Sequence, residues 1–194
     1  MEGSIQMNKL KGIRSINPQL FSLWIAMASI VMLFGAFTSA YIVKQAAGNW
    51  LEFSIPSHFY ISTAAILLSS FTLSRANRFF KEENESAYKS MLWITLILGV
   101  SFVVLQYFGW MTLFNNGVDF RLNVSGSFFY LITGAHAAHV LGGIAALIVA
   151  ILHASTLQFK VTEKRINRLK LTTHYWHFVD ALWIYLLLFL LIIK

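Results

Sequence analysis

The chain has 194 residues, of which 57% are hydrophobic and 12% are charged, and its mean hydropathy is +0.64. This composition excludes an ordinary soluble domain and indicates a protein of the lipid bilayer. The net charge of +7 does not indicate nucleic-acid binding, because the Lys and Arg residues fall in short segments between apolar runs. The absence of Cys excludes disulfides, thiolate metal sites and c-type haem attachment.

The apolar runs predict helices that span the membrane. A spanning helix needs about 20 mostly apolar residues, because the hydrocarbon core is about 30 Å thick and each helical residue rises about 1.5 Å. Five runs meet this length, and they cover residues 19–43, 57–73 with a continuation to 80, 90–114, 125–159 and 171–193. None of them alternates as the wall of a β-barrel does. The fourth run exceeds one span, so we expect its ends to lie in the interface or to tilt.

The segments outside these runs are short or polar. Residues 1–18 are polar and precede a long apolar run, so we expect a cytoplasmic N-terminal segment and no cleaved signal. The later connections are short, and the sequence shows no internal repeat. We therefore expect an all-α fold, with one integral membrane domain of five transmembrane helices over residues 19–194.

The basic residues predict how the helices are oriented. Twelve of them fall on one side of the expected membrane: Lys9, Lys11, Arg14, Arg75, Arg78, Lys81, Lys89, Lys160, Lys164, Arg165, Arg168 and Lys170. The other side has only Lys44, Arg121 and Lys194. Because short cytoplasmic loops are rich in Lys and Arg, the N-terminus is expected in the cytoplasm and the C-terminus outside. The expected location is a cytoplasmic membrane, which the chain crosses several times.

Ionisable residues inside the last two runs are the strongest functional signal. His136 and His139 lie three residues apart in the fourth run, and His174, His177 and Asp180 recur at the same interval in the fifth. This spacing places each set on one face of a helix. Charged or titratable side chains at such depth need partners, so we expect these five residues to form a structural polar network.

We expect Asp180 to accept a hydrogen bond from an imidazole of the fourth helix. From the inner ends of the helices, His139 lies about 20 Å up and Asp180 about 14 Å, so their levels can meet. A competing interpretation is that the histidines hold a b-type haem or a metal, since imidazole is the usual ligand of both. Each pair lies on a single helix, whereas bis-His haem needs ligands from two opposing helices, which favours the structural interpretation.

Small and aromatic residues complete the pattern. Gly134, Gly142 and Gly143 lie around the histidines of the fourth run, where small residues allow the backbones of two membrane helices to approach closely. Trp176 falls near an expected membrane interface, where it would serve as an interfacial anchor. We expect no catalytic, cofactor-binding or metal-ligating residue in this chain.

Two motifs in the last two runs resemble the cytochrome oxidase subunit III family. Residues 175–180 read YWHFVD and are followed by Trp183, which resembles the signature of that family's last helix. Residues 133–140 read TGAHAAHV, similar to the stretch that the family carries in its penultimate helix. Five spans resemble the short form of the family, which lacks two N-terminal helices. Two positions depart from the family pattern, because Ile30 and Gly109 stand where many members carry an acid.

The resemblance implies an accessory subunit without a redox centre in a proton-pumping terminal oxidase of aerobic respiratory electron transport. It implies that the chain packs against the catalytic subunit I, stabilises it and supports proton uptake. Haem and copper are then expected in partner subunits, and bound phospholipid is expected on this chain. A respiratory supercomplex is a further partner that the resemblance leaves open.

Several alternatives stay open on the sequence. Within the family, the chain could serve a quinol oxidase or be an accessory subunit of a nitric oxide reductase, because partner subunits decide the electron donor and acceptor. Outside it, the chain could be a b-type membrane cytochrome that uses its buried histidines. A small transporter with Asp180 as its coupling site is disfavoured, because the spans contain no second acid and no mid-span Pro.

Overall fold

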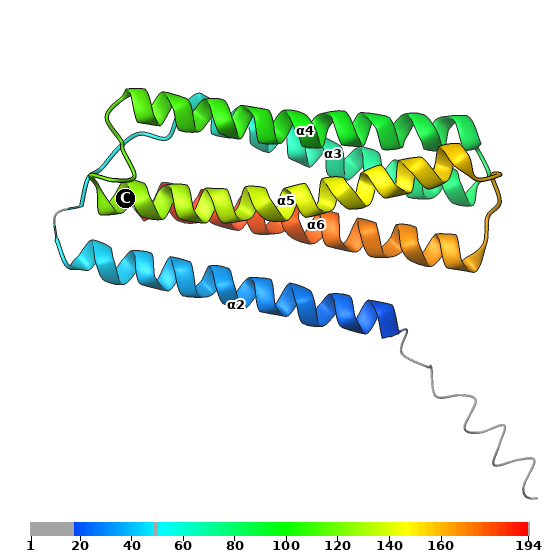
Figure 1. Ribbon diagram of the computed structural model, residues 1–194, viewed down its shortest axis with the longest axis horizontal. Coiled ribbons are helices and arrows are strands. Elements are labelled where there is room, and N and C mark those ends of the chain that lie inside the picture. Colours follow the sequence, from blue (N-terminus) through cyan, green and yellow to red (C-terminus); the bar gives the residue numbers. More distant parts are fainter. Residues whose placement is uncertain (1–17, 49, 194) are drawn as a thin grey trace, which may run out of the picture.

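The computed structural model describes residues 18–48 and 50–193. Its regular elements in this part of the chain are five α-helices, and no β-strand occurs among these residues (Figure 1). The helices are α2 (Pro18–Ala46), α3 (Ser57–Lys81), α4 (Glu85–Asn115), α5 (Val124–Thr156) and α6 (Glu163–Ile192). The expected all-α fold is confirmed. Apart from Pro18, the polar leader lies outside the described residues.

The helix boundaries agree with the apolar runs to within three residues, except at the starts of α4 and α6, where each helix begins earlier than its run. The last run begins at residue 171, but α6 begins at Glu163, because a polar first part continues the helix beyond its apolar stretch. Thr162 caps this end, and its Oγ1 accepts a hydrogen bond from the backbone N–H of Arg165 at 3.4 Å. Hydropathy detects only the part of a helix that lies in hydrocarbon, so it missed these first turns.

Four of the helices are long and apolar enough to cross a membrane, namely α2, α4, α5 and α6. They indicate a multi-pass membrane protein. The helix that falls short of this criterion is α3, which is rich in Ser and Thr and carries Arg75 and Arg78 near its end. The reason for its polar composition becomes clear from its contacts with α6.

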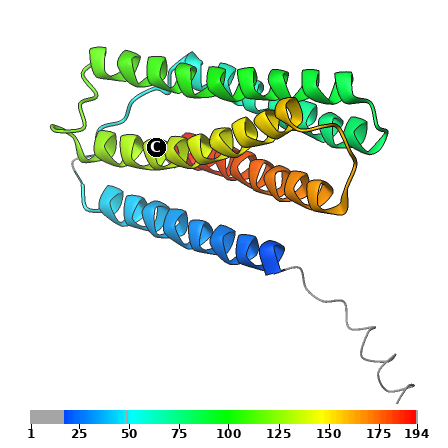
Figure 2. The same ribbon diagram turned by 45° about the vertical axis from the view of Figure 1, so that its right-hand side comes forward.

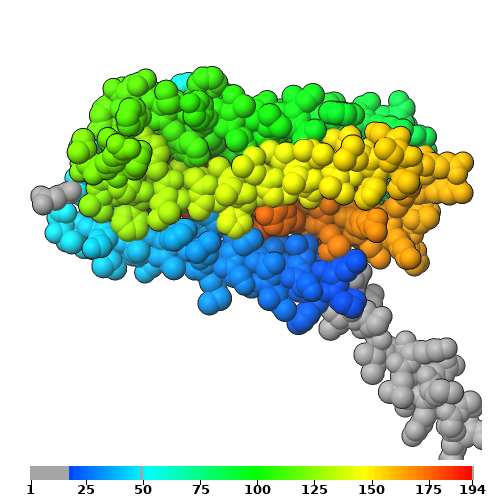
Figure 3. Space-filling view, viewed as in Figure 1, coloured from blue at the N-terminus to red at the C-terminus, as the bar shows by residue number. Residues whose placement is uncertain are grey.

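Four helices, α3 to α6, form the main bundle, and α2 lies along its outside (Figures 1 and 2). α3 and α4 form an antiparallel hairpin joined by a tight turn, in which Glu83 adopts a positive φ of 59°. The side chain of Asn84 then caps α4 by accepting a hydrogen bond from the N–H of Ala87 at 3.1 Å. α2 contacts α5 and α6, against which it lies in the space-filling view (Figure 3).

A few buried side chains attach α2 to the bundle. Phe34 is fully buried and meets the ring of His139 edge-on at 5.6 Å. The hydroxyls of Thr38 and Tyr185 lie 3.2 Å apart, and the hydroxyl of Tyr41 donates to the carbonyl oxygen of Ile193. Most of the remaining surface of α2 is exposed and apolar, so it is available to lipid or to another membrane protein.

Candidate functional site

Side chains of α3 and α6 form a line of hydrogen bonds along the contact between these helices, which we call the polar seam. Its members are Thr63, Ser69, Ser70, Ser74 and Asn77 of α3, and Thr173, Trp176, His177, Asp180 and Trp183 of α6. The pairs follow the antiparallel course of the two helices, from Thr63 with Trp183 to Asn77 with Thr173. Much of the hydroxyl content of α3 thus serves contacts with α6.

Ser70 lies at the centre of the seam between His177 and Asp180. Its hydroxyl donates to Oδ2 of Asp180, and its oxygen lies 2.9 Å from Nδ1 of His177. Nε2 of the same ring lies 3.1 Å from Oγ of Ser74, whose hydroxyl also donates to the carbonyl oxygen of Ser70. The imidazole of His177 therefore bridges two hydroxyl groups of α3.

Two buried tryptophans extend the seam on both sides of Ser70. The indole N–H of Trp176 donates to Oγ of Ser69 at 2.9 Å, and that of Trp183 donates to Oγ1 of Thr63 at 2.9 Å. Trp176 is 2% exposed and Trp183 is fully buried. The expectation that Trp176 is an interfacial anchor is therefore wrong, since its ring lies inside the bundle.

The expected hydrogen bond between Asp180 and an imidazole of α5 is also wrong. Asp180 bonds Ser70 of α3, and its other oxygen, Oδ1, is buried with no partner among the described residues. His139 directs Nδ1 to the carbonyl of Ala135 in its own helix, at 2.7 Å. His174 likewise directs its Nδ1 to the carbonyl oxygen of Lys170 in its own helix, at 2.7 Å, and its side chain is exposed. Of the five residues that were expected to form one network, only His177 and Asp180 belong to the seam.

His136 makes a different contact between helices. Its Nε2 lies 3.2 Å from the carbonyl oxygen of Val179 in α6, to which it must donate because a carbonyl only accepts. The ring is fully buried and packs against Trp183, with 4.9 Å between centroids, and against Phe102. Its Nε2 is thus engaged by α6, and its Nδ1 is buried with no partner among the described residues. Across residues 18–48 and 50–193, no group of three His, Asp or Glu side chains could hold a metal ion.

The glycines expected to allow close packing differ from one another. A Cβ added at Gly143 would lie 2.9 Å from Cε3 of Trp176, so this glycine makes room for the indole. At Gly142 the nearest atom would be the Tyr175 hydroxyl at 3.4 Å, which is an ordinary contact. At Gly134 no atom of another described helix lies within 4 Å, so no close packing is found there within residues 18–48 and 50–193. The sequence interpretation missed Gly99, where the distance to Trp176 would be 2.7 Å.

The seam residues of α3 were absent from the sequence interpretation, although the chain contains a signal for them. Ser62, Thr63, Ser69, Ser70 and Ser74 form a dense set of hydroxyls within an otherwise apolar run. Hydroxyls in a membrane helix bond either their own backbone or a neighbouring helix, so such a density points to a polar partner face. The ionisable side chains alone indicate the α6 half of the seam and leave out its α3 half.

The match to known proteins agrees with the two motifs, which fall on α5 and α6 at the contacts just described. A family model described as cytochrome c oxidase subunit III matches residues 21–193. The chain belongs to the cytochrome c oxidase subunit III family. The resemblance seen in the sequence is thereby confirmed, and the chain is a subunit of an oxidase complex.

Relatives from several bacteria share most of the chain. It is 31% identical over 170 residues to a probable cytochrome c oxidase subunit 3 of Nocardia farcinica, covering 81% of this chain and 79% of that protein. It is 33% identical over 165 residues to a probable cytochrome c oxidase subunit 3 of Mycobacterium leprae, with coverage of 81% and 79%. A probable cytochrome c oxidase subunit 3 of Rickettsia bellii is 33% identical over 166 residues, which cover 81% of this chain and 57% of that protein.

The structure accounts for one of the two departures from the family pattern. Gly109 is buried, and a Cβ at this position would lie 2.5 Å from Cε2 of Phe59. An acidic side chain there is incompatible with the present position of Phe59, whose ring fills that space. Ile30 is half-buried and packs against the core. Any role that cytochrome c oxidase subunit III derives from those two carboxylates therefore has no counterpart at these positions.

Proposed function

We propose that this chain is an accessory subunit without a redox centre that packs against the catalytic subunit I of a haem-copper oxidase of the cytochrome c oxidase type. In this role it stabilises subunit I, supports proton uptake and carries membrane lipid. Haem and copper reside in the partner subunits. The observation that carries the proposal is His136, whose ring is enclosed by aromatic side chains and whose Nε2 bonds the backbone of α6. In this proposal His136 connects two helices, which the bond from its Nε2 to α6 supports.

All five helices cross the bilayer in this proposal, including α3. With 25 residues, α3 is about 37 Å long, which exceeds the hydrocarbon thickness of about 30 Å. The hydroxyls in its middle turns are bonded to neighbouring helices, as those of Ser62, Ser69 and Ser70 are. Its exposed positions include the apolar Leu67 and Leu68. A helix that turns hydroxyls inward and aliphatic groups outward suits a membrane protein.

The proposed orientation places the start of α2 and the start of α6 on the cytoplasmic side of a bacterial inner membrane. The end of α3, the start of α4 and the α5–α6 connection lie at this same end of the bundle (Figure 1). The basic residues of the described part are concentrated here, with Lys44 and Arg121 at the opposite end. Such a bias is typical of the cytoplasmic side of a membrane.

Purification of the chain in mild detergent, with a tag added to it, tests the proposed role. We expect a larger subunit with haem and copper to co-purify, and the complex to oxidise cytochrome c. Oxidation of quinol without oxidation of cytochrome c would show a quinol oxidase instead. A Soret band from the chain expressed alone with added haem would contradict the accessory role and favour a b-type cytochrome.

Deletion of the chain provides an independent test. We expect the remaining oxidase to retain its haem, because none is bound here, while its activity declines over repeated turnovers faster than that of the complete complex. The measurement is the haem absorbance per catalytic subunit, together with oxygen consumption over time. Loss of all haem on deletion would contradict the proposal.

A further inference from the structure

Arg75 is a charged residue of α3 that lies within the apolar part of the bundle. Asn77 bonds Thr173 of α6 at 2.5 Å, so these two residues lie at one level. Thr173 is two residues past the start of the last apolar run, and Arg75 is two residues deeper than Asn77. The backbone of Arg75 therefore lies about 6 Å inside the start of that run. The contact between the hydroxyls of Thr72 and Thr95 of α4, 2.8 Å apart, gives about 3 Å by the same count.

The guanidinium group of Arg75 is directed towards the middle of the membrane. Its Cζ lies over the ring of Phe71, at 5.0 Å from the centroid, and Phe71 is one turn deeper in the membrane. The side chains of a helix lean towards its N-terminus, and the N-terminus of α3 is at the outer end. Arg75 therefore does not extend to the inner headgroups, as a basic side chain near the end of a membrane helix usually does.

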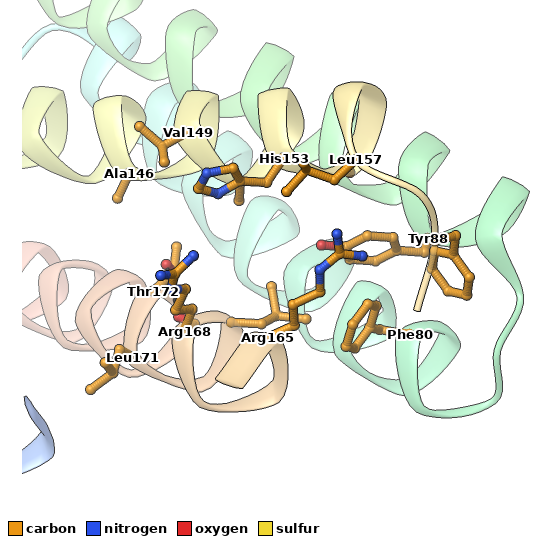
Figure 4. A pocket seen from close by; sticks show the side chains of 14 residues that line it. Phe80, Tyr88, Ala146, Val149, His153, Leu157, Arg165, Arg168, Leu171 and Thr172 are labelled. Carbon is orange, nitrogen blue, oxygen red and sulfur yellow. Dashed lines mark hydrogen bonds between the residues drawn. The ribbon is translucent and has the colours of Figure 1, made fainter. Parts of the chain in front are cut away.

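Arg75 also has no acidic partner in the described part of the chain. Its side chain is exposed and makes no ion pair or hydrogen bond within residues 18–48 and 50–193. Two other arginines at this end of the bundle do have partners. Arg78 forms an ion pair with Glu82 at 2.7 Å. Arg165, at the start of α6 (Figure 4), donates to the carbonyl oxygen of Gln158 at 2.9 Å. A charge at the depth of Arg75 needs a partner as well.

The exposed residues around Arg75 form one face of α3. We call it the α3 outer face and define it by Ala64, Leu67, Leu68, Phe71 and Arg75. The exposed positions of α4 from residue 93 to residue 111 are all apolar or aromatic, as suits a surface in contact with acyl chains. The α3 outer face differs from them because it combines apolar groups with a charge. Such a combination indicates contact with another protein.

We propose that the α3 outer face packs against a membrane helix of the catalytic subunit, and that a carboxylate of that helix forms an ion pair with Arg75. A carboxylate matches the guanidinium group, and a helix can present it at the depth of Phe71, which is further from the headgroups than a lipid phosphate lies. Leu67 and Leu68 provide apolar contact beside the pair. Protein then surrounds α3 on both faces, which explains why α3 is less apolar than the other helices. The inference rests on the proposed function and adds the contact face and the chemistry of the partner.

Photo-crosslinking of the complete oxidase complex tests what covers this face. A benzoylphenylalanine replaces Leu68, which is 57% exposed, and the matched control places it at Val104 of α4, which is 46% exposed. We expect Leu68 to crosslink to the haem-bearing subunit, at a membrane helix that carries Asp or Glu within two turns of the crosslink, and Val104 to give no such product. Mass spectrometry of the digested product locates the site. Crosslinks from Leu68 to lipid alone, or equal products from both positions, would overturn the proposed face.

Substitution of Arg75 tests the ion pair in the same complex. Arg75→Gln should make the tagged chain dissociate from the haem-bearing subunit about tenfold faster in detergent. Arg75→Lys keeps the charge and should accelerate dissociation less than threefold. The control is Arg78→Gln, which removes the same charge from an exposed position of α3 and should have less than a twofold effect. Equal acceleration by Arg75→Gln and Arg78→Gln would contradict the pair. A haem-bearing subunit that co-purifies without a crosslink to Leu68 rejects this face alone, whereas the absence of such a subunit from the unmodified complex rejects the proposed function.

Discussion

The two faces of α6 are attached to their neighbours by different means. Towards α3, α6 makes side-chain hydrogen bonds, with Ser70 between His177 and Asp180 at their centre. Towards α5, it relies on close packing, where the indole of Trp176 lies against Gly143. The hydrogen bonds on that side involve the backbone, as in the bond from the Tyr175 hydroxyl to the carbonyl oxygen of His139 at 3.0 Å.

This difference shows how one helix can be held when no hydrophobic driving force acts between helices. Lipid tails are as apolar as Leu, so membrane helices associate through close packing and interhelical hydrogen bonds. α6 uses both, one on each face, and Trp176 joins them because its ring fills the space at Gly143 while its N–H bonds Ser69. We therefore expect the face of α6 that packs against α5 to be destabilised most by added side-chain volume. We expect the seam to be destabilised most by the removal of polar groups.

Added volume at the packed face should have the largest effect. Gly143→Leu places a side chain where a Cβ alone would lie 2.9 Å from Trp176, so we expect a loss of about 3 kcal/mol in the free energy of unfolding. The measurement is an SDS titration of the subunit in mixed micelles, followed by circular dichroism. The control is Ala145→Leu, which adds the same side chain type at an exposed position of α5 and should be nearly neutral.

Removal of the central hydroxyl of the seam should have the next largest effect. Ser70→Ala leaves the buried carboxyl of Asp180 with no described partner, so we expect a loss of about 2 kcal/mol in the same titration. The control is Ser101→Ala, because that hydroxyl bonds only the carbonyl of Ile97 in its own helix.

A double-mutant cycle then separates the observed pairing of Asp180 from the one expected from the sequence. Ser70→Ala combined with Asp180→Ala should give a coupling energy of about 1 kcal/mol. His139→Ala combined with Asp180→Ala should give none, because Asp180 bonds α3 and His139 bonds its own helix. Coupling in the second cycle alone would restore the original expectation.

A smaller effect is expected at the outer end of the seam. Thr63→Val keeps the shape of the side chain but removes the acceptor of the Trp183 indole, so we expect a loss of about 1 kcal/mol. Thr112→Val is a close control, because both hydroxyls bond a carbonyl of their own helix and only Thr63 also accepts from another helix. Equal losses from the two variants would show that the interhelical bond contributes nothing.

The number and approximate extent of the helices could be predicted because hydropathy and length depend only on local sequence. α3 shows the limit of such a prediction. Its apolar run is interrupted by hydroxyls whose partners lie on α6, which the local sequence does not reveal. The start of α6 was missed for a related reason, because Glu163 and the residues after it lie in a polar stretch that a hydropathy argument cannot assign.

The site was predicted less well because a helical repeat gives the face of a residue but not its neighbour. His177 and Asp180 were correctly placed on one face of α6, yet the partner on that face proved to be α3 instead of α5. Predicting it would have required the relative rotation of three helices. The hydroxyls of Ser69 and Ser70 were the available signal, because such residues have few reasons to be dense in a membrane helix.

The smallest effect is expected at Gly134, which composition alone could not distinguish from Gly143. No described atom lies within 4 Å of a Cβ added at Gly134, so Gly134→Ala in the isolated subunit should change the free energy of unfolding by less than about 0.5 kcal/mol. Gly99→Ala is the informative contrast, because its Cβ would meet Trp176 at 2.7 Å and should destabilise the bundle. If both variants behaved alike, the contact with Trp176 would not be what makes a glycine necessary on these helices. The difference between them therefore measures how closely the indole of Trp176 is packed by its neighbouring helices.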